Sequence, residues 1–341
     1  MRGFRGALSA MLVAFPLLGG AGRAEGQQPP RVDVSRFILD LDVPESPALV
    51  ALGRAGVRVL RGSAPKPVSA GFGVGAADGA PGSAAGALDV SPAYLFGGGV
   101  RSLPSYRSNS LEGRVKRVLT KTILSVAAAR EGGGAGATRW ALGVRSTFHD
   151  PHDPVLNSDL PEEAAGLGAP ERAAAAGAAP AARGGDLSAL FAASRREMRG
   201  RCCVQVSAGW GMSAAPSADA AGGDGGGAPR HTLWVAAQFT LGPRLDVLTT
   251  AEGRDAFRPE AYGRVGAALQ RKGSAADVRA ELLYDGGARR VSPGAAAELR
   301  LLPRTAALLA VSSSPRPRGG AGGSALRLDA LLRWYVAEPE R

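Results

Sequence analysis

The stretch that decides the fold is Ala325-Leu-Arg-Leu-Asp-Ala-Leu-Leu-Arg-Trp-Tyr-Val336, near the end of the chain. Its residues alternate in character: one face holds Leu326, Leu328, Ala330, Leu332, Trp334 and Val336, and the other holds Arg327, Asp329, Arg333 and Tyr335. Successive side chains of a β-strand point to opposite faces, so this segment presents an apolar face to one medium and a charged face to another. The pattern is typical of a transmembrane β-barrel, in which the apolar face meets lipid and the polar face meets the lumen.

The same alternation recurs along most of the chain and predicts an all-β fold, a transmembrane antiparallel barrel of about twelve strands. The expected strands are residues 68–77, 86–96, 118–130, 138–149, 201–212, 232–241, 245–250, 262–271, 275–285, 294–302, 305–313 and 325–336. Most have the ~9–11 residues that a tilted strand needs to cross a bilayer. From residue 201 onward short turns alternate with longer loops, as in outer-membrane barrels. A soluble β-sandwich also alternates, so the pattern alone does not separate a lumen from solvent.

Charged residues on the inward faces are the main candidates for function. The predicted lumen-lining residues are Lys121, Arg139, Arg145, Arg264, Asp277, Arg279, Glu281, Glu298, Arg300, Arg327, Asp329 and Arg333. Such side chains form either a solvated wall or cross-strand pairs that narrow the lumen, and twelve strands leave both alternatives open. In the first strand, Gly71, Gly73 and Gly75 face inward and leave room for a helix or for close backbone approach.

The first residues have the features of a secretory signal. Arg2 and Arg5 precede an apolar run at residues 7–18, and cleavage is expected after Ala24. The run is shorter than the ~20 residues of a membrane-spanning helix. We therefore expect a signal peptide at residues 1–24, an N-terminal periplasmic segment at 25–64 and a monomeric barrel at 65–341, exported to the outer membrane of a Gram-negative bacterium.

Two short helices are expected outside the strands. The N-terminal one begins after Ser46, has Pro47 in its first turn and ends at Gly53. The mid-chain helix is expected at residues 186–199, within a long helical insertion at 150–200 whose apolar residues recur at helical spacing: Leu187, Leu190, Phe191 and Met198. It is expected to pack under the barrel, to enter it as a plug or to cover an edge.

The stretch Asp42-Val-Pro-Glu-Ser-Pro-Ala48, followed by Leu52-Gly53 and a glycine-rich first strand, resembles the mature N-terminus of a family of bacterial outer-membrane barrel proteins of uncharacterised role. The resemblance covers about a dozen residues. It implies the barrel and its N-terminal segment, and it implies no catalytic residue.

Composition limits the class of partner. The chain carries 41 basic and 30 acidic residues, a net charge of +11, but its arginines are scattered along the strands. A nucleic-acid partner is therefore not expected, since such a protein groups its basic residues in a patch. Cys202 and Cys203 are adjacent and are either two small strand residues or a vicinal redox pair.

Residues with catalytic or metal-binding chemistry are few. Phe148-His-Asp-Pro-His-Asp-Pro154 groups two histidines and two aspartates that could ligate a divalent metal, but its prolines favour an ordinary turn. A lipid-acting enzyme would need a serine and a histidine on one strand face, and Ser146 and His149 have the wrong spacing. We expect no enzymatic activity, metal or cofactor.

The sequence thus favours a passive channel or transport protein whose partners are the lipid bilayer and small solutes. The alternative is a structural or assembly anchor that binds a protein partner, of unknown identity, through its helix or loops. A lipid-acting outer-membrane enzyme is the third hypothesis.

Overall fold

The computed structural model describes residues 45–62, 68–77, 82–92, 106–130, 138–151, 153, 156, 204–214, 229–242, 244–257, 261–273, 275–302, 305–315 and 324–336. The expected signal peptide at 1–24, the expected helix at 186–199 and the pair Cys202 and Cys203 lie outside these residues.

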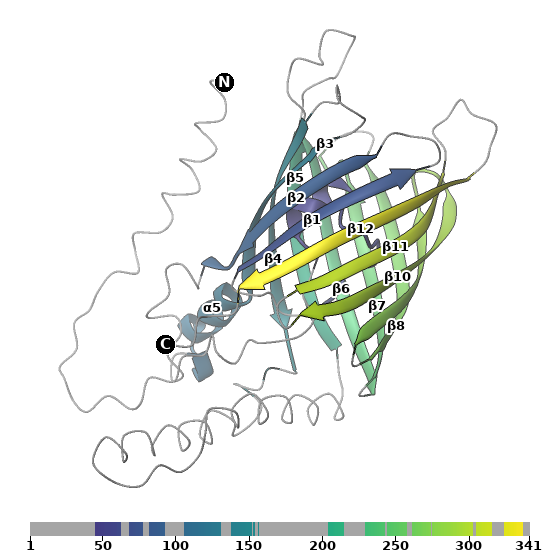
Figure 1. Ribbon diagram of the computed structural model, residues 1–341. Coiled ribbons are helices and arrows are strands. Elements are labelled where there is room, and N and C mark those ends of the chain that lie inside the picture. Colours follow the sequence, from purple (N-terminus) through teal and green to yellow (C-terminus); the bar gives the residue numbers. More distant parts are fainter. Residues whose placement is uncertain are drawn as a thin grey trace, which may run out of the picture. The chain divides into compact units, whose positions relative to one another are not determined.

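Twelve antiparallel strands close into one barrel (Figure 1). The strands are β1 (Val68–Ala77), β2 (Ser83–Val90), β3 (Thr122–Arg130), β4 (Thr138–His149), β5 (Val204–Ala214), β6 (Arg230–Gly242), β7 (Leu245–Arg254), β8 (Tyr262–Lys272), β9 (Ala276–Asp285), β10 (Arg290–Leu302), β11 (Thr305–Pro315) and β12 (Ser324–Val336). Each pairs with its neighbours in sequence, and β1 closes the ring on β12 with Phe72 opposite Leu332. Closure satisfies the backbone groups of both edges and confirms the predicted fold class.

The two faces of the wall differ as the alternation predicts. On β9 the outward Val278 and Leu282 are 56% and 57% exposed, whereas the intervening Arg279 and Glu281 are 3% and 5% exposed. On β12 the side chains of Leu326, Leu328, Leu332 and Trp334 are about half exposed. The outer surface is therefore apolar in these strands, and the charged side chains are enclosed.

The described residues include two helices, α2 (Pro47–Leu52) and α5 (Leu111–Thr120). Neither is long or apolar enough to cross a membrane. The first matches the expected N-terminal helix. The second was not predicted, and because of it the strand expected at 118–130 begins only at Thr122.

Local interactions explain why α5 forms. The Ser110 hydroxyl caps it by accepting a hydrogen bond from the Gly113 amide at 3.1 Å. Glu112 in its first turn pairs with Lys116 at 2.6 Å, one helical turn further along.

The short strand expected at 245–250 also differs from the structure, because β7 continues to Arg254 and pairs along its length with β6 and β8.

Candidate functional site in the barrel lumen

Residues 45–62 lie inside the barrel. Helix α2 contacts β2, β3, β4, β5 and β6, and all six of its residues are buried. In Figure 1 the purple segment is seen between the strands of the wall. Of the N-terminal segment expected at 25–64, residues 25–44 lie outside the described chain, and the described part from residue 45 fills lumen space. We call residues 45–62 the inserted segment.

The wall helps to form the ends of α2. Ser46 gives its helix no side-chain cap, because its hydroxyl donates to Asp89 at 2.7 Å and contacts the Ser125 hydroxyl at 2.8 Å. The Ser125 hydroxyl instead accepts the Ala48 amide, at 3.3 Å. At the other end Gly53 adopts φ 68°, which ends the helix in the left-handed region. The helix therefore begins where β2 and β3 supply its polar partners.

Glycines in the wall make the space that α2 occupies. A Cβ placed on Gly143 of β4 would lie 2.6 Å from the Pro47 Cβ, and one on Gly211 of β5 would lie 2.6 Å from the Ala51 Cβ. Both distances are shorter than real Cβ contacts, so only glycine permits this close approach. The expected room beside the first strand is also used, because Leu49 Cδ1 lies 3.9 Å from a Cβ placed on Gly71.

A buried carboxylate joins the two ends of the inserted segment. Glu45 is 1% exposed, and its Oε2 accepts the Arg61 amide at 2.9 Å. Its Oε1 lies 3.5 Å from Arg279 Nη2 and 3.9 Å from Arg61 Nε, and its Oε2 lies 4.0 Å from Arg145 Nη1. A charge removed from water is stable only when it is paired and hydrogen-bonded, and three guanidinium groups from different parts of the chain do this here.

Arg61 extends this cluster to the far wall. Its Nη2 contacts Glu298 Oε2 at 2.6 Å, and the same oxygen lies 3.7 Å from Arg333 Nη1. Its carbonyl oxygen accepts hydrogen bonds from Arg145 and from the Ser207 hydroxyl. One inserted residue thus contacts strands β4, β5 and β10.

The returning half of the inserted segment is bound mainly through its backbone. The Leu60 amide donates to Thr250 Oγ1 at 2.7 Å, and the Val59 carbonyl accepts Arg279 Nη1 at 2.6 Å. The Arg58 amide donates to Glu281 Oε2 at 3.1 Å. These contacts reach β7 and β9, so the inserted segment is held from several sides of the lumen.

Several arginines line the lumen toward the end with the longer loops. Arg254 Nη2 donates to the Val50 carbonyl at 3.3 Å, and Arg327 Nη2 donates to the Gly53 carbonyl at 3.0 Å. Arg264 pairs with Asp285 at 2.7 Å. The Arg264 and Arg327 side chains are 26% and 25% exposed, so water reaches this end of the lumen.

The predicted lumen-lining residues fall into three groups. Arg145, Arg279, Glu281, Glu298, Arg327 and Arg333 contact or surround the inserted segment, as described above. In the second group Asp277 pairs with Arg300 at 3.1 Å near the β8–β9 turn, Asp329 pairs with Arg327 at 2.8 Å, Arg264 pairs with Asp285 at 2.7 Å, and Arg139 is half-buried on β4. Lys121 lies before β3, at the barrel end with the shorter turns. Glu45 and Arg61 were not among the predicted residues; Glu45 lies just before α2, and Arg61 lies at the far end of the inserted segment.

Lys121 belongs to a separate buried cluster. Its Nζ lies 3.2 Å from Asp150 Oδ2 and 2.6 Å from Asp153 Oδ2. Gln205 donates to Asp150 at 2.6 Å, and the Tyr106 hydroxyl donates to Asp153 at 2.5 Å. The carboxylates of the motif at 148–154 are therefore held by an ammonium group, an amide and a phenol.

Burial and charge shift the pKa values in this cluster. Burial by itself would lower the pKa of Lys121, but the carboxylates of Asp150 and Asp153 outweigh it, so the pKa is raised. Burial and the Asp153 carboxylate raise the pKa of Tyr106 well above its usual range. Lys121 therefore stays charged as the counter-ion of the two aspartates.

The two described histidines lie at strand ends. His231 stacks on Trp210 at a ring-centroid distance of 5.8 Å and meets Phe257 edge-on at 5.1 Å. His149 is exposed at the end of β4. Within the described ranges, no three His, Cys, Asp or Glu side chains are grouped so that they could hold a metal ion.

Comparisons with known proteins give only distant similarity. No protein-family model matches the chain, and no curated protein matches it. Among solved structures, it is similar to "KdgM porin in complex with disordered oligogalacturonate", with 6% identity, TM-score 0.43 and 79% of this chain and 99% of that chain covered. The Acinetobacter baumannii outer membrane protein Omp33 is 7% identical with a TM-score of 0.39, and the match covers 79% of this chain and 98% of that chain. Outer membrane phospholipase A from Escherichia coli is 7% identical with a TM-score of 0.39, and the match covers 89% of this chain and 96% of that chain. Similarity at this level does not separate a channel from an enzyme.

Proposed function

We propose that this chain is an outer-membrane transport protein, a passive channel whose conducting path is narrowed by the inserted segment. The apolar outer face suits a bilayer, and the enclosed charges suit a polar path. The observation that carries the proposal is the position of residues 45–62, which fill lumen space while partly exposed arginines remain at one end. The resemblance of residues 42–53 to the N-terminus of an outer-membrane barrel family agrees with it.

The solutes that we propose are small anions. Arg58, Arg254, Arg264 and Arg327 belong to the lumen, and Arg58 lies within electrostatic range of Arg264 and Arg327. Acidic partners such as Asp285 and Asp329 offset part of this charge. Rings of positive groups favour anions at close range, so the reversal potential in a salt gradient should show anion preference.

Bilayer recording of the purified barrel tests this function. The wild type should show small single-channel conductance, and a variant with residues 45–62 replaced by a flexible Gly-Ser linker should conduct several-fold more. Heat-dependent mobility on gels identifies preparations in which the barrel has folded. If both proteins are folded and neither conducts, the channel function is wrong.

The alternative function is an anchor for a protein partner, and a specific observation favours it. Leu49, Val50, Leu52, Val57 and Leu60 of the inserted segment are all at most 6% exposed. Burial of each large aliphatic side chain contributes about 1.5–3 kcal/mol, so releasing the segment would cost on the order of 10 kcal/mol. The segment is then a permanent part of the barrel, and a folded protein without conductance would support the anchor. No enzymatic activity is proposed.

A further inference from the structure

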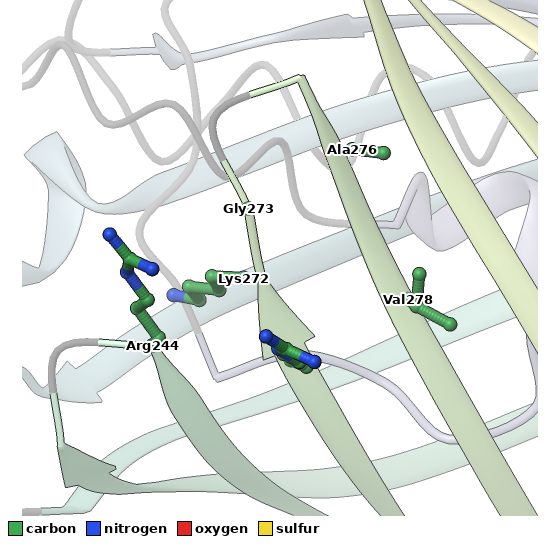
Figure 2. A pocket seen from close by; sticks show the side chains of 6 residues that line it. Arg244, Lys272, Gly273, Ala276 and Val278 are labelled. Atoms are coloured by element: carbon green, nitrogen blue, oxygen red, sulfur yellow. The ribbon is translucent and has the colours of Figure 1, made fainter.

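A basic pocket lies at the barrel end with the short turns, where the β6–β7 and β8–β9 turns meet. It has a volume of about 360 Å³ and is lined by Arg244, Arg271, Lys272, Gly273, Ala276 and Val278. Figure 2 shows the nitrogen-bearing ends of Arg244 and Lys272 close together, with Val278 farther along β9. The inserted segment does not take part in this pocket.

The pocket lies at the edge of the apolar outer surface. Arg271 is exposed, and it lies opposite Leu245 of β7 and Val278 of β9. The next outward residue on its own strand, Leu269, is 50% exposed, and Val278 is 56% exposed. An outward arginine directly beside lipid-facing side chains places its guanidinium at the level of the lipid headgroups.

Two positive charges are available there. The charge of Lys272 is compensated by Asp246, whose carboxylate lies 2.8 Å from the Lys272 Nζ. Arg244 and Arg271 form no ion pair with an acidic side chain of the described residues. Arg300 beside them is held by Asp277 at 3.1 Å. The pocket therefore combines two uncompensated guanidinium groups with an apolar edge.

A backbone hydrogen bond joins the two turns, because the Lys272 amide donates to the Arg244 carbonyl at 2.8 Å. Arg300 of β10 holds the second turn, since its Nη1 donates to the Gly273 carbonyl at 2.8 Å. Such contacts reduce the loss of conformational freedom when a ligand is bound by the side chains above them.

We infer that this pocket binds the phosphate group of a membrane phospholipid, with Arg244 and Arg271 contacting the phosphate and Val278 contacting the first part of an acyl chain. Guanidinium groups bind phosphate oxygens through paired, charge-assisted hydrogen bonds. The inference rests on the membrane location of the proposed function, and it is independent of whether the lumen conducts.

Native mass spectrometry of the full barrel tests the inference, with phosphatidylglycerol and diacylglycerol of the same acyl chains as probes. The wild type should retain phosphatidylglycerol and not diacylglycerol. The variant Arg244→Ala/Arg271→Ala should retain on the order of tenfold less phosphatidylglycerol than the wild type, since each basic residue near the membrane surface contributes to anionic lipid binding. The matched control is Arg289→Ala/Arg290→Ala, which removes two exposed arginines beyond the other end of β9.

The outcomes separate the possible ligands. Equal retention by the pocket variant and the control overturns the inference, as does equal retention of the two lipids by the wild type. Binding of inorganic phosphate at the same arginines, without lipid retention, would identify a free anion as the ligand and overturn the lipid assignment. If lipid retention fails while the folded barrel conducts, the proposed transport function stands without this pocket.

Discussion

The Glu45 carboxylate accepts the Arg61 amide at 2.9 Å and so closes the inserted segment into a loop inside the barrel. The two residues are 16 positions apart, and the apolar helix α2 lies between them. Arg145 and Arg279 of the wall approach the same carboxylate. A single buried charge therefore connects both ends of the segment to opposite parts of the wall.

Replacing this charge should loosen the inserted segment. In Glu45→Gln the guanidinium groups of Arg145 and Arg279 lose a counter-ion, and breaking a buried pair costs about 3–5 kcal/mol of unfolding free energy. Urea titration of the barrel in vesicles measures this loss, and single-channel conductance should rise. Glu112→Gln is the control, because the Glu112 side chain is 69% exposed. Equal stability of the two variants would show that the cluster does not hold the segment.

The second prediction concerns the close approach of α2 to β5. In Gly211→Ala the new Cβ would lie 2.6 Å from the Ala51 Cβ, and overpacking of this kind costs about 1–3 kcal/mol. Gly253→Ala should have little effect on the same urea titration, because a Cβ there meets no atom within 4 Å. The loss of unfolding free energy caused by Gly211→Ala should be smaller in an Ala51→Gly background, and a double-mutant cycle measures this difference. An undiminished loss would mean that the contact lies elsewhere.

The strands were predictable because alternation is a local property of the sequence. The face assignments on β9 and β12 follow from period-two patterning, which requires no knowledge of the partner strand. Helix α5 was missed because its last residues belong to the stretch assigned to the strand expected at 118–130, and only Leu111 and Val115 are large apolar residues before them. Its N-cap Ser110 was the signal that could have identified it.

The inserted segment was predicted as a helix but not as the occupant of the lumen. Leu49 and Val50 show that α2 needs apolar partners, yet those partners are small residues scattered over several strands, such as Ala127, Ala141 and Ala236. Only the closed barrel brings them together. Arg61 gave no local signal, because Arg54 and Arg58 also follow the apolar run of α2.

The third prediction tests which face meets lipid. Arginine at the outward Leu282 should cost ~2–4 kcal/mol if the position is near the bilayer midplane, and Val144→Arg should behave alike. Leu282→Met is the control, because it keeps an apolar side chain of similar volume. Folding yield into vesicles, read from heat-dependent gel mobility, measures the effect. A higher folding yield for Leu282→Arg than for a polar replacement of the enclosed Glu281 would show that the strand faces are reversed.

The last prediction uses the raised pKa of Lys121. Because the folded protein binds the Lys121 proton more tightly than the unfolded chain does, the stabilisation is complete below the ordinary pKa of 10.5 and is lost as pH rises through the higher folded pKa. In Lys121→Met, Asp150 and Asp153 lose this counter-ion, so the barrel should be less stable at neutral pH by on the order of 3 kcal/mol.

The difference in unfolding free energy between wild type and Lys121→Met should therefore be constant through neutral pH and shrink in the alkaline range. Using this difference cancels the groups outside the cluster that titrate in the same range. Lys116→Met is the matched control. Lys116 forms an ion pair at 2.6 Å with the exposed Glu112, and the loss of such a surface pair should leave the unfolding free energy nearly unchanged. A Lys121→Met barrel as stable as wild type would show that the cluster contributes nothing.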